Sequence, residues 1–419
     1  MKQTLVKIFL FFLLILLVVS FGNDKQTIAH QKPASTFRLG NENLLSENIA
    51  LISGKNVGIV TNNSGILSDG TLLVDAMLQL NKEKINVTKI FSPEHGFRGD
   101  DNDNNHIDSK TGIEIVTLYG NKKKPSSSDL SNVDVLVYDI QDVGTRFYTF
   151  INTMYYCMEA AIENNKQIVI CDRPIIQNPE YIDGFMLSPD IKSFVGMLPI
   201  SAVYGLTCGE LANYLNTVEL SGKCNLQISK MSGYSRTTEY TSLNLAWVKP
   251  SPSMYFPSTA VAYAGTCLLE GTNFAEGRGT DKPFEYVGAP YCDGNVLKTE
   301  MDSYGFAGVE FTAIEFTPTS ITSPSNPPKF VGEKCSGIYV NITDKKTAEP
   351  FKIGVALLIS LNKLFPKFKI RDDKFLDKLS GTRELRKMIL DGKDLSYIIS
   401  TFQTPLSEYK SSISSFFLY

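Results

Sequence analysis

The chain has 419 residues, of which 43% are hydrophobic and 20% charged, and its formal net charge is −3. This composition is typical of a globular protein and not of a disordered one, while the length predicts two domains. Because the net charge is close to zero, we expect no general attraction to nucleic acid.

The N-terminus has the composition of an export signal. Lys2 and Lys7 precede an apolar run over residues 8–19, and small or polar residues follow it. The run is short for a transmembrane helix, which needs about 20 residues. We therefore predict a cleaved signal peptide over 1–22, a polar tether over 23–48, and an exported protein, periplasmic or secreted, without stable membrane insertion. A retained N-terminal anchor is the alternative.

The first half of the chain alternates short apolar strands with helices. Strands are expected at 56–62, 86–91, 133–140 and 166–171, and helices at 71–80 and 148–163. Strands that are apolar throughout and separated by helices predict a parallel sheet covered on both faces. We therefore expect a doubly wound, Rossmann-like α/β domain over residues 49–235.

The second half has a different pattern, so we place a domain boundary near residue 235. Strands are expected at 309–316 and 337–342, and helices at 352–364, 384–390 and 394–402. Strands and helices of this kind predict a C-terminal α/β domain over residues 236–419.

Polar residues follow each predicted strand of the first half. They are Asn62, Glu94, His95, Asp139, Gln141, Asp142, Asp172 and Arg173. In open parallel sheets, ligands bind outside the carboxyl ends of the strands. We therefore expect these side chains to converge on one crevice.

The segment FSPEHGFRGD (91–100) contains the most distinctive pair, Glu94 and His95. A histidine titrates near neutral pH, and a carboxyl group at the edge of a sheet can be tuned by burial. Either group can transfer protons in acid–base catalysis. The alternative is a purely structural ion pair between Glu94 and Arg98 beside a hydrogen-bonded histidine.

The segment EGTNFAEGRGTDKPF (270–284) is a second candidate. It combines Glu270, Glu276 and Arg278 with glycines that let the backbone approach a ligand closely. The alternative is a glycine-rich turn whose charges pair with one another. Arg146 is similarly open, because it can hold an anionic group or form a local pair beside a helix that Asp142 caps.

Several kinds of site are excluded by missing motifs. No GxGxxG follows the first strand, and the chain lacks a P-loop, an HExxH motif, a histidine–cysteine cluster and a GxSxG motif. We therefore expect no nucleotide, no metal and no other cofactor. The remaining carboxylates, arginines and amides suit a polyhydroxylated substrate, and paired carboxyl groups are typical of glycoside hydrolases.

Long segments of the chain resemble one known family, the bacterial exo-β-N-acetylmuramidases of the NamZ type. The matching segments are 57–65 (VGIVTNNSG), 91–100, 111–120, 133–150, 172–174, 196–215, 250–254 (PSPSM) and 265–290. The resemblance implies release of N-acetylmuramic acid from the non-reducing ends of peptidoglycan fragments. It also implies an active-site cleft between the Rossmann-like domain and a smaller C-terminal domain.

The resemblance also suggests roles for individual residues. Glu94 corresponds to the proposed catalytic carboxylate of the family and is our candidate general acid, oriented by His95. Glu276 is our choice for the second carboxylate, with Glu270 behind it. The substrates would be MurNAc–GlcNAc and muropeptides. Candidate substrate-binding residues are Asn62, Arg98, Asp139, Gln141, Asp142, Arg146, Tyr148, Asp172, Arg173, Glu270, Asn273 and Arg278.

The chain departs from the family pattern at a few positions near the expected substrate face. Ile175 and Ile176 replace an Asn-Pro pair, Phe185 follows Gly184 where proline is usual, and Ser253 replaces an asparagine. These departures motivate a second hypothesis, a non-catalytic binding protein for muramyl sugars. A transferase that uses a nucleotide donor is a weaker alternative.

Overall fold

The structure is a computed structural model that describes residues 37–80, 85–99, 106–321 and 327–419. The predicted signal peptide and the first part of the predicted tether lie outside these residues. Within the described ranges, no helix has the length and apolar character needed to cross a membrane.

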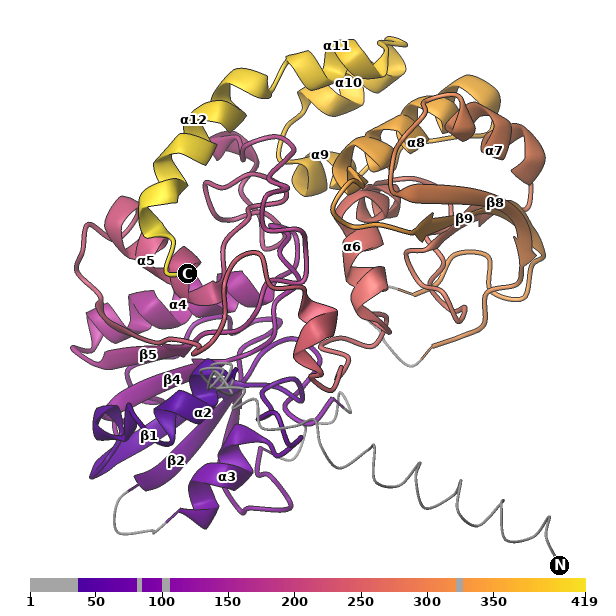
Figure 1. The fold of residues 1–419 in the computed structure, drawn as a ribbon. Coiled ribbons are helices and arrows are strands. Elements are labelled where there is room, and N and C mark those ends of the chain that lie inside the picture. Colours follow the sequence, from indigo (N-terminus) through magenta and orange to yellow (C-terminus); the bar gives the residue numbers. More distant parts are fainter. Residues whose placement is uncertain (1–36, 81–84, 100–105, 322–326) are drawn as a thin grey trace, which may run out of the picture. The chain divides into compact units, whose positions relative to one another are not determined.

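A six-stranded parallel sheet forms the first half of the described chain (Figure 1). Its strands are β1 (Lys55–Thr61), β2 (Ile85–Ser92), β3 (Glu114–Thr117), β4 (Val135–Asp139), β5 (Gln167–Cys171) and β6 (Asn225–Ser229). The order β3-β2-β1-β4-β5-β6 is that of the classic doubly wound fold, in which the winding direction reverses between β1 and β4. The predicted Rossmann-like fold is confirmed, although β3 and β6 were not predicted.

Alternate residues of each strand face opposite sides of this sheet, as the strand period of two requires. On β4, Val137 packs with helices on one face and Tyr138 with helices on the other. The first face is covered by α2 (Gly40–Leu44) and α3 (Leu73–Gln79), and the second by α4 (Phe150–Glu163) and α5 (Cys208–Val218). Burial of both faces explains why the central strands β4 and β5 are almost entirely apolar.

Residues 37–48, which the sequence assigned to the tether, are part of the folded domain. They include α2 (Gly40–Leu44), whose Asn41 side chain is fully buried. Asn41 donates hydrogen bonds to the Ile66 carbonyl and to Asp139 Oδ2, each at 2.9 Å. The polar composition of the segment therefore reflects buried hydrogen bonds and not exposure to water.

The second half contains a three-stranded antiparallel sheet and most of the remaining helices. The strands, in the order β7-β9-β8, are β7 (Tyr286–Ala289), β8 (Val309–Phe316) and β9 (Cys335–Ile342). The helices are α6 (Pro257–Thr266), α7 (Gly294–Asp302), α8 (Pro350–Leu364), α9 (Phe375–Ser380), α10 (Glu384–Leu390), α11 (Leu395–Ser400) and α12 (Gln403–Ile413). Short 3-10 helices are η1 (Ile49–Leu51), η3 (Pro189–Ile191), η4 (Tyr240–Leu243), η5 (Cys267–Gly271) and η6 (Ser414–Phe416).

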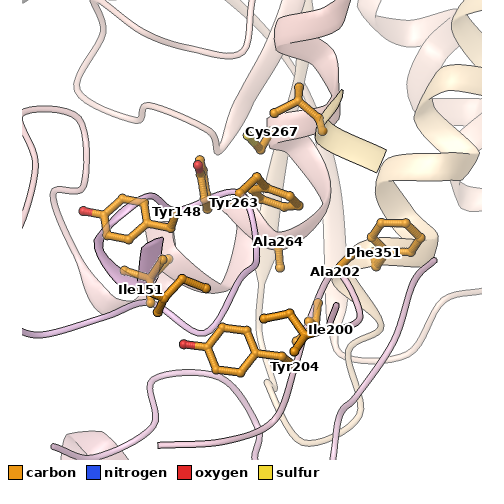
Figure 2. Close-up of a cluster of buried hydrophobic side chains, with 14 of the residues drawn as sticks. Tyr148, Ile151, Ile200, Ala202, Tyr204, Tyr263, Ala264, Cys267 and Phe351 are labelled. Atoms are coloured by element: carbon orange, nitrogen blue, oxygen red, sulfur yellow. The ribbon is translucent and has the colours of Figure 1, made fainter. Parts of the chain in front are cut away.

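The two halves share one hydrophobic core, part of which is drawn in Figure 2. There Tyr148 of the first half lies beside Tyr263 of α6, with ring centroids 5.8 Å apart. Helix α6 also packs closely on α8 at Gly265, which has no side chain. A Cβ at this position would lie only 1.8 Å from the Pro350 carbonyl oxygen. This contact fixes the position of η5, which follows α6 directly.

All seven cysteines are buried free thiols. Burial raises the pKa of the Cys157 thiol well above its usual range, so this residue stays protonated and packs as a small apolar side chain.

Candidate active site

A cavity of about 260 Å³ is lined by side chains from both halves of the chain. It lies where β2 ends, beside the start of α4, the loop at 250–254 and the glycine-rich segment that begins in η5. Its polar lining residues are Glu94, His95, Thr149, Ser251, Ser253, Glu270 and Arg278. Its aromatic lining residues are Tyr119, Phe147, Tyr148, Phe150, Phe194, Tyr263, Phe284 and Phe375.

The turn after β2 delivers Glu94 and His95 to this cavity. His95 has φ 73°, a left-handed conformation that is uncommon for a residue with a side chain and is often found at functional sites. Thr149 donates a hydrogen bond from its hydroxyl to Glu94 Oε2 at 2.9 Å. Among the described residues, no lysine or arginine forms an ion pair with Glu94. The carboxyl group is therefore held by a neutral donor at the cavity wall.

Arg98 does not pair with Glu94, which removes the purely structural alternative for that glutamate. Its Nε and Nη2 each lie 2.7 Å from an oxygen of Asp108, and Nη2 lies 3.4 Å from Asp75 Oδ1. The hydrogen bonds from Arg98 lower the pKa of Asp108 to about 2 against the effect of burial. Arg98 thus anchors the loop after Glu94 and is not among the residues that line the cavity.

Glu270 and Arg278 form an ion pair that also lines the cavity. Arg278 Nη2 lies 2.6 Å from Glu270 Oε1, and Nη1 donates to Ser253 Oγ at 3.3 Å. Burial lowers the pKa of Arg278, but Glu270 and Glu276 raise it by more, so the guanidinium stays charged. Of the described residues that line the cavity, Arg278 is the only arginine or lysine.

Glu276, our sequence-based choice for the second carboxylate, lies behind this pair. It is 2% exposed, contacts Lys329 Nζ at 2.7 Å, and does not line the cavity. Burial raises its pKa, but Lys329 and then Arg278 lower it to below the usual value. The carboxylate at the cavity wall in this segment is therefore Glu270.

Asn62 supports the cavity indirectly. Its Nδ2 donates to the Pro250 carbonyl at 3.2 Å, while Nδ2 of the next residue, Asn63, donates to the Lys249 carbonyl at 3.0 Å. These two bonds tie the end of β1 to the loop at 250–254, whose serines line the cavity. The sequence placed Asn62 in contact with the sugar, but its side chain holds this loop.

Most of the other predicted strand-end residues form a separate, sealed group at the ends of β1, β4 and β5. We name it the switch-point cluster: the predicted residues Asp139, Gln141, Asp142 and Arg173, together with Asn41 of α2, which donates a hydrogen bond to Asp139. Arg173 Nε lies 2.6 Å from Asp139 Oδ1, and both side chains are at most 4% exposed. Gln141 and Arg173 border two voids of only about 10 Å³ each. The expected single crevice is thus divided, and this part of it is filled by the chain itself.

Asp142 and Asp172 also form internal hydrogen bonds. Asp142 accepts from the Tyr204 hydroxyl and the Gly144 amide, and Asp172 Oδ1 accepts from the Gly209 amide at 2.8 Å. Burial raises the pKa of Asp142 to about 7 and that of Asp172 to about 6. Neither residue lines the cavity, so neither is placed to contact a substrate there.

Arg146 is a structural clamp. It is fully buried, and its terminal nitrogens donate to the carbonyls of Phe185, Ile200, Leu379 and Ser380 at 2.6 to 3.3 Å. A Cβ on Gly381 would lie 2.2 Å from Arg146 Nη2, so the backbone closes tightly over the guanidinium. Arg146 is therefore not placed to hold a substrate carboxylate. Its guanidinium bonds to backbone carbonyls and joins the first half of the chain to α9.

Two further predicted residues have different positions. Tyr148 lines the cavity and packs edge-on against Phe150 and Tyr263, with ring centroids 4.9 and 5.8 Å apart. Asn273 joins two surface loops, because Nδ2 donates to the Lys367 carbonyl and Oδ1 accepts from the Lys369 amide. Tyr148 therefore remains a candidate for substrate contact, whereas Asn273 lies outside the cavity lining.

Comparison with known proteins identifies the family. The model described as exo-beta-N-acetylmuramidase NamZ, N-terminal, matches residues 57–258, and the corresponding C-terminal model matches residues 261–419. The chain belongs to the NamZ family. It is 36% identical over 405 residues to the peptidoglycan beta-N-acetylmuramidase NamZ of Bacillus subtilis, covering 96% of this chain and 95% of that protein.

Two solved structures, both DUF1343 family proteins of Bacteroides fragilis, resemble this NamZ family member. One has a TM-score of 0.84 at 30% identity and the other 0.73 at 32%, and the matches cover 92% and 91% of this chain and 99% of each of those chains. The resemblance to the NamZ family and the Rossmann-like fold are therefore confirmed. At the level of the family, so is the expected enzyme class, a glycosidase.

Of the departures from the usual NamZ pattern, Ser253 reaches the cavity, where it accepts the hydrogen bond from Arg278. Ile175 and Ile176 are buried outside the cavity lining, and Phe185 packs on Phe402 with ring centroids 4.6 Å apart. In the described parts of the chain, no group of three or more His, Cys, Asp or Glu side chains is arranged to hold a metal ion.

Thr149, Tyr263 and Lys329 were not among the residues predicted for the site. Thr149 and Tyr263 line the cavity, and Lys329 contacts Glu276. Thr149 could have been found from its position in the first turn of the predicted helix at 148–163, where it precedes the observed helix α4 as its N-cap residue. Lys329 carries no comparable signal, because tertiary folding alone brings it to Glu276.

Proposed function

We propose that this protein is an exo-acting β-N-acetylmuramidase that releases N-acetylmuramic acid from the non-reducing ends of peptidoglycan fragments. The observation that carries the proposal is that Glu94 and Glu270 line one cavity from different segments and have different partners. A pair of carboxyl groups in unlike environments is the usual apparatus of glycoside hydrolysis. Membership of the NamZ family supports the same reaction.

The surroundings of the two carboxyl groups support different roles. Glu94 is held by the Thr149 hydroxyl, a neutral donor, so it can exchange a proton with the glycosidic oxygen as general acid and base. Glu270 is paired with Arg278 and is suited to act as a carboxylate that stabilises positive charge at the anomeric carbon. His95, beside Glu94, would orient the reacting group.

The cavity also supports recognition of a single terminal sugar. Its volume of about 260 Å³ is at the small end for ligand pockets, which suits one sugar residue better than the interior of a long glycan. Arg278 would bind the lactyl carboxylate that distinguishes muramic acid from glucosamine, since guanidinium groups bind carboxylates in a bidentate manner. Tyr148 and Tyr263 would pack against the sugar ring.

A pair of chromogenic substrates tests the proposal. The purified protein is incubated with a β-N-acetylmuramic acid glycoside and with its N-acetylglucosamine counterpart. We expect release of the chromophore from the muramic compound and at least tenfold less from the other. Saturable binding of the muramic sugar without product after long incubation would overturn the proposed activity and favour a non-catalytic binding protein.

We propose further that the protein acts outside the cytoplasm. Two lysines precede a short apolar run at 8–19, as in secretory signal peptides, and a peptidoglycan substrate is consistent with that location. Expression of the full chain in a bacterial host, followed by fractionation and N-terminal sequencing, tests this. A mature N-terminus near residue 23 is expected, and a cytoplasmic protein that retains residue 1 would contradict it.

A further inference from the structure

A row of alternating charges, in which two buried glutamates pair with two half-buried cations, starts at the cavity wall. We name it the charge chain: Glu270, Arg278, Glu276 and Lys329. The separations are 2.6 Å from Glu270 Oε1 to Arg278 Nη2, 3.4 Å from Arg278 Nε to Glu276 Oε1, and 2.7 Å from Glu276 Oε2 to Lys329 Nζ. Only Glu270 and Arg278 line the cavity. The other two members do not reach it, yet they contact the members that do.

Lys329 is fixed by three hydrogen bonds. Besides Glu276 Oε2, its Nζ donates to the Leu269 carbonyl at 3.0 Å and to the Phe274 carbonyl at 2.7 Å. An ammonium group has three donors, and here each has a partner. Leu269 immediately precedes Glu270. The Lys329 side chain therefore holds both the backbone next to Glu270 and the carboxylate of Glu276, which faces Arg278.

Two strained residues lie next to the charge chain. Phe284 has φ 63° and Phe330 has φ 57°, a left-handed conformation that is a steric outlier for bulky side chains. The Arg278 guanidinium lies over the Phe284 ring, 4.8 Å from its centroid, and Phe330 follows Lys329 in sequence. Such strain persists where the surrounding structure over-determines a site. The strain at Phe284 and Phe330 therefore supports a functional role for the fixed positions of Arg278 and Lys329.

We propose that Lys329 and Glu276 are positioning residues, which set the orientation of Arg278 and Glu270 at the cavity wall and thereby the binding and turnover of the muramyl sugar. This inference rests on the proposed function. The charge chain has two cations and two anions, so it is balanced. Without Lys329, Arg278 would be the one ion-pair partner of Glu276 among the described residues, and Glu276 would draw the guanidinium away from Glu270.

Steady-state kinetics of variants on the chromogenic muramic acid glycoside provide the first test. We expect Lys329→Met to reduce kcat/KM at least tenfold, mainly through KM, and to move the acidic limb of its pH profile to higher pH, because the site becomes more negative. Lys329→Arg should retain more activity. The double variant Lys329→Met, Glu276→Gln restores charge balance and should recover part of the loss.

Lys334→Met is the matched control. Lys334 lies five residues after Lys329 in the same segment and forms an exposed ion pair with Glu315. It should leave kcat/KM unchanged. A Lys329→Met variant with lower thermal stability but unchanged kcat/KM and pH profile would overturn the proposal and leave Lys329 with a structural role only.

A crystal structure of Lys329→Met supplies a readout that needs no turnover. We expect Arg278 Nη2 to move out of hydrogen-bond distance of Glu270 Oε1, from the present 2.6 Å. An unchanged contact would contradict the positioning role even if the wild-type protein were inactive on the glycoside. Conversely, inactive wild-type protein whose variant shows the displaced arginine would contradict the proposed function and not the positioning role.

Discussion

Two groups of polar side chains at the ends of the parallel strands contain the same residue types and differ in what surrounds them. In the switch-point cluster, Asp139 and Arg173 pair with each other beside voids of about 10 Å³. At the end of β2, Glu94 has a neutral donor and faces a cavity of about 260 Å³. A polar residue at a strand end therefore indicates a ligand site only where space and unused hydrogen-bonding capacity remain.

Substitution of Glu94 is expected to have the largest effect on activity and tests whether the cavity at the end of β2 is the active site. The substitution Glu94→Gln preserves shape but removes the ability to exchange a proton, so we expect kcat/KM on the muramic acid glycoside to fall by about 10²–10⁴-fold. The thermal unfolding temperature should be unchanged. Glu408→Gln, at an exposed position on α12, is the control and should be neutral. Near-normal turnover by folded Glu94→Gln would remove Glu94 from the mechanism.

Arg173→Met tests the opposite region. It leaves the Asp139 carboxylate buried without its cation, which costs about 3–5 kcal/mol of unfolding free energy. Turnover per folded molecule should stay within a few-fold of wild type, because the pair does not line the cavity. Denaturant unfolding measures the first quantity and active-site-normalised kinetics the second. A loss of turnover as large as that of Glu94→Gln, without a loss of stability, would make the switch-point cluster part of the active site.

Asp142, in the switch-point cluster, makes the free energy of unfolding depend on pH. Burial raises its pKa from 3.8 to about 7, against hydrogen bonds from Tyr204 and Gly144 that lower it. Between these two values the folded state retains a proton that the unfolded state has lost. The free energy of unfolding therefore falls as pH rises through this window, by at most about 1.4 kcal/mol per pH unit.

Asp142→Asn should remove this slope. Urea unfolding between about pH 6 and 7 isolates the effect, because Asp172, whose pKa is raised by burial to about 6, contributes a slope of the same sign mainly below that range. An unchanged pH dependence in the variant would show that Asp142 is ionised throughout.

Thr149→Val has the smallest expected effect. It removes the hydrogen bond to Glu94 Oε2 and should lower kcat by about tenfold or less, in line with about 0.5–1.5 kcal/mol for one such bond. Thr149→Ser keeps the hydroxyl and should restore most of the activity. Equal losses in the two variants would mean that the methyl group, and not the hydrogen bond, is what matters.

The sequence predicted much of the fold because four strands of the sheet are rich in buried apolar residues. The two edge strands were missed for a physical reason. Only part of β3 (Glu114–Thr117) and β6 (Asn225–Ser229) is buried, so neither has a continuous apolar run. Residues 37–48 were misassigned because buried polar side chains such as Asn41 look like exposed ones in a sequence.

The candidate site was predicted in part. Glu94, Glu270 and Arg278 lie in segments whose composition is unusual, and all three line the cavity. Arg146 has the same chemistry, but two of its partners, the carbonyls of Leu379 and Ser380, lie more than 230 residues away along the chain. No local sequence pattern distinguishes an arginine that can bind a ligand from one whose hydrogen bonds are already made to distant backbone carbonyls.

The most direct test of the central claim is a crystal structure of the Glu94→Gln variant soaked with a muramic acid glycoside. We predict density for the sugar in the cavity between Gln at position 94 and the Glu270–Arg278 pair, with the lactyl carboxylate near the guanidinium, and an undisturbed switch-point cluster. A sugar bound against Asp139 and Arg173, with the cavity at the end of β2 empty, would contradict the account.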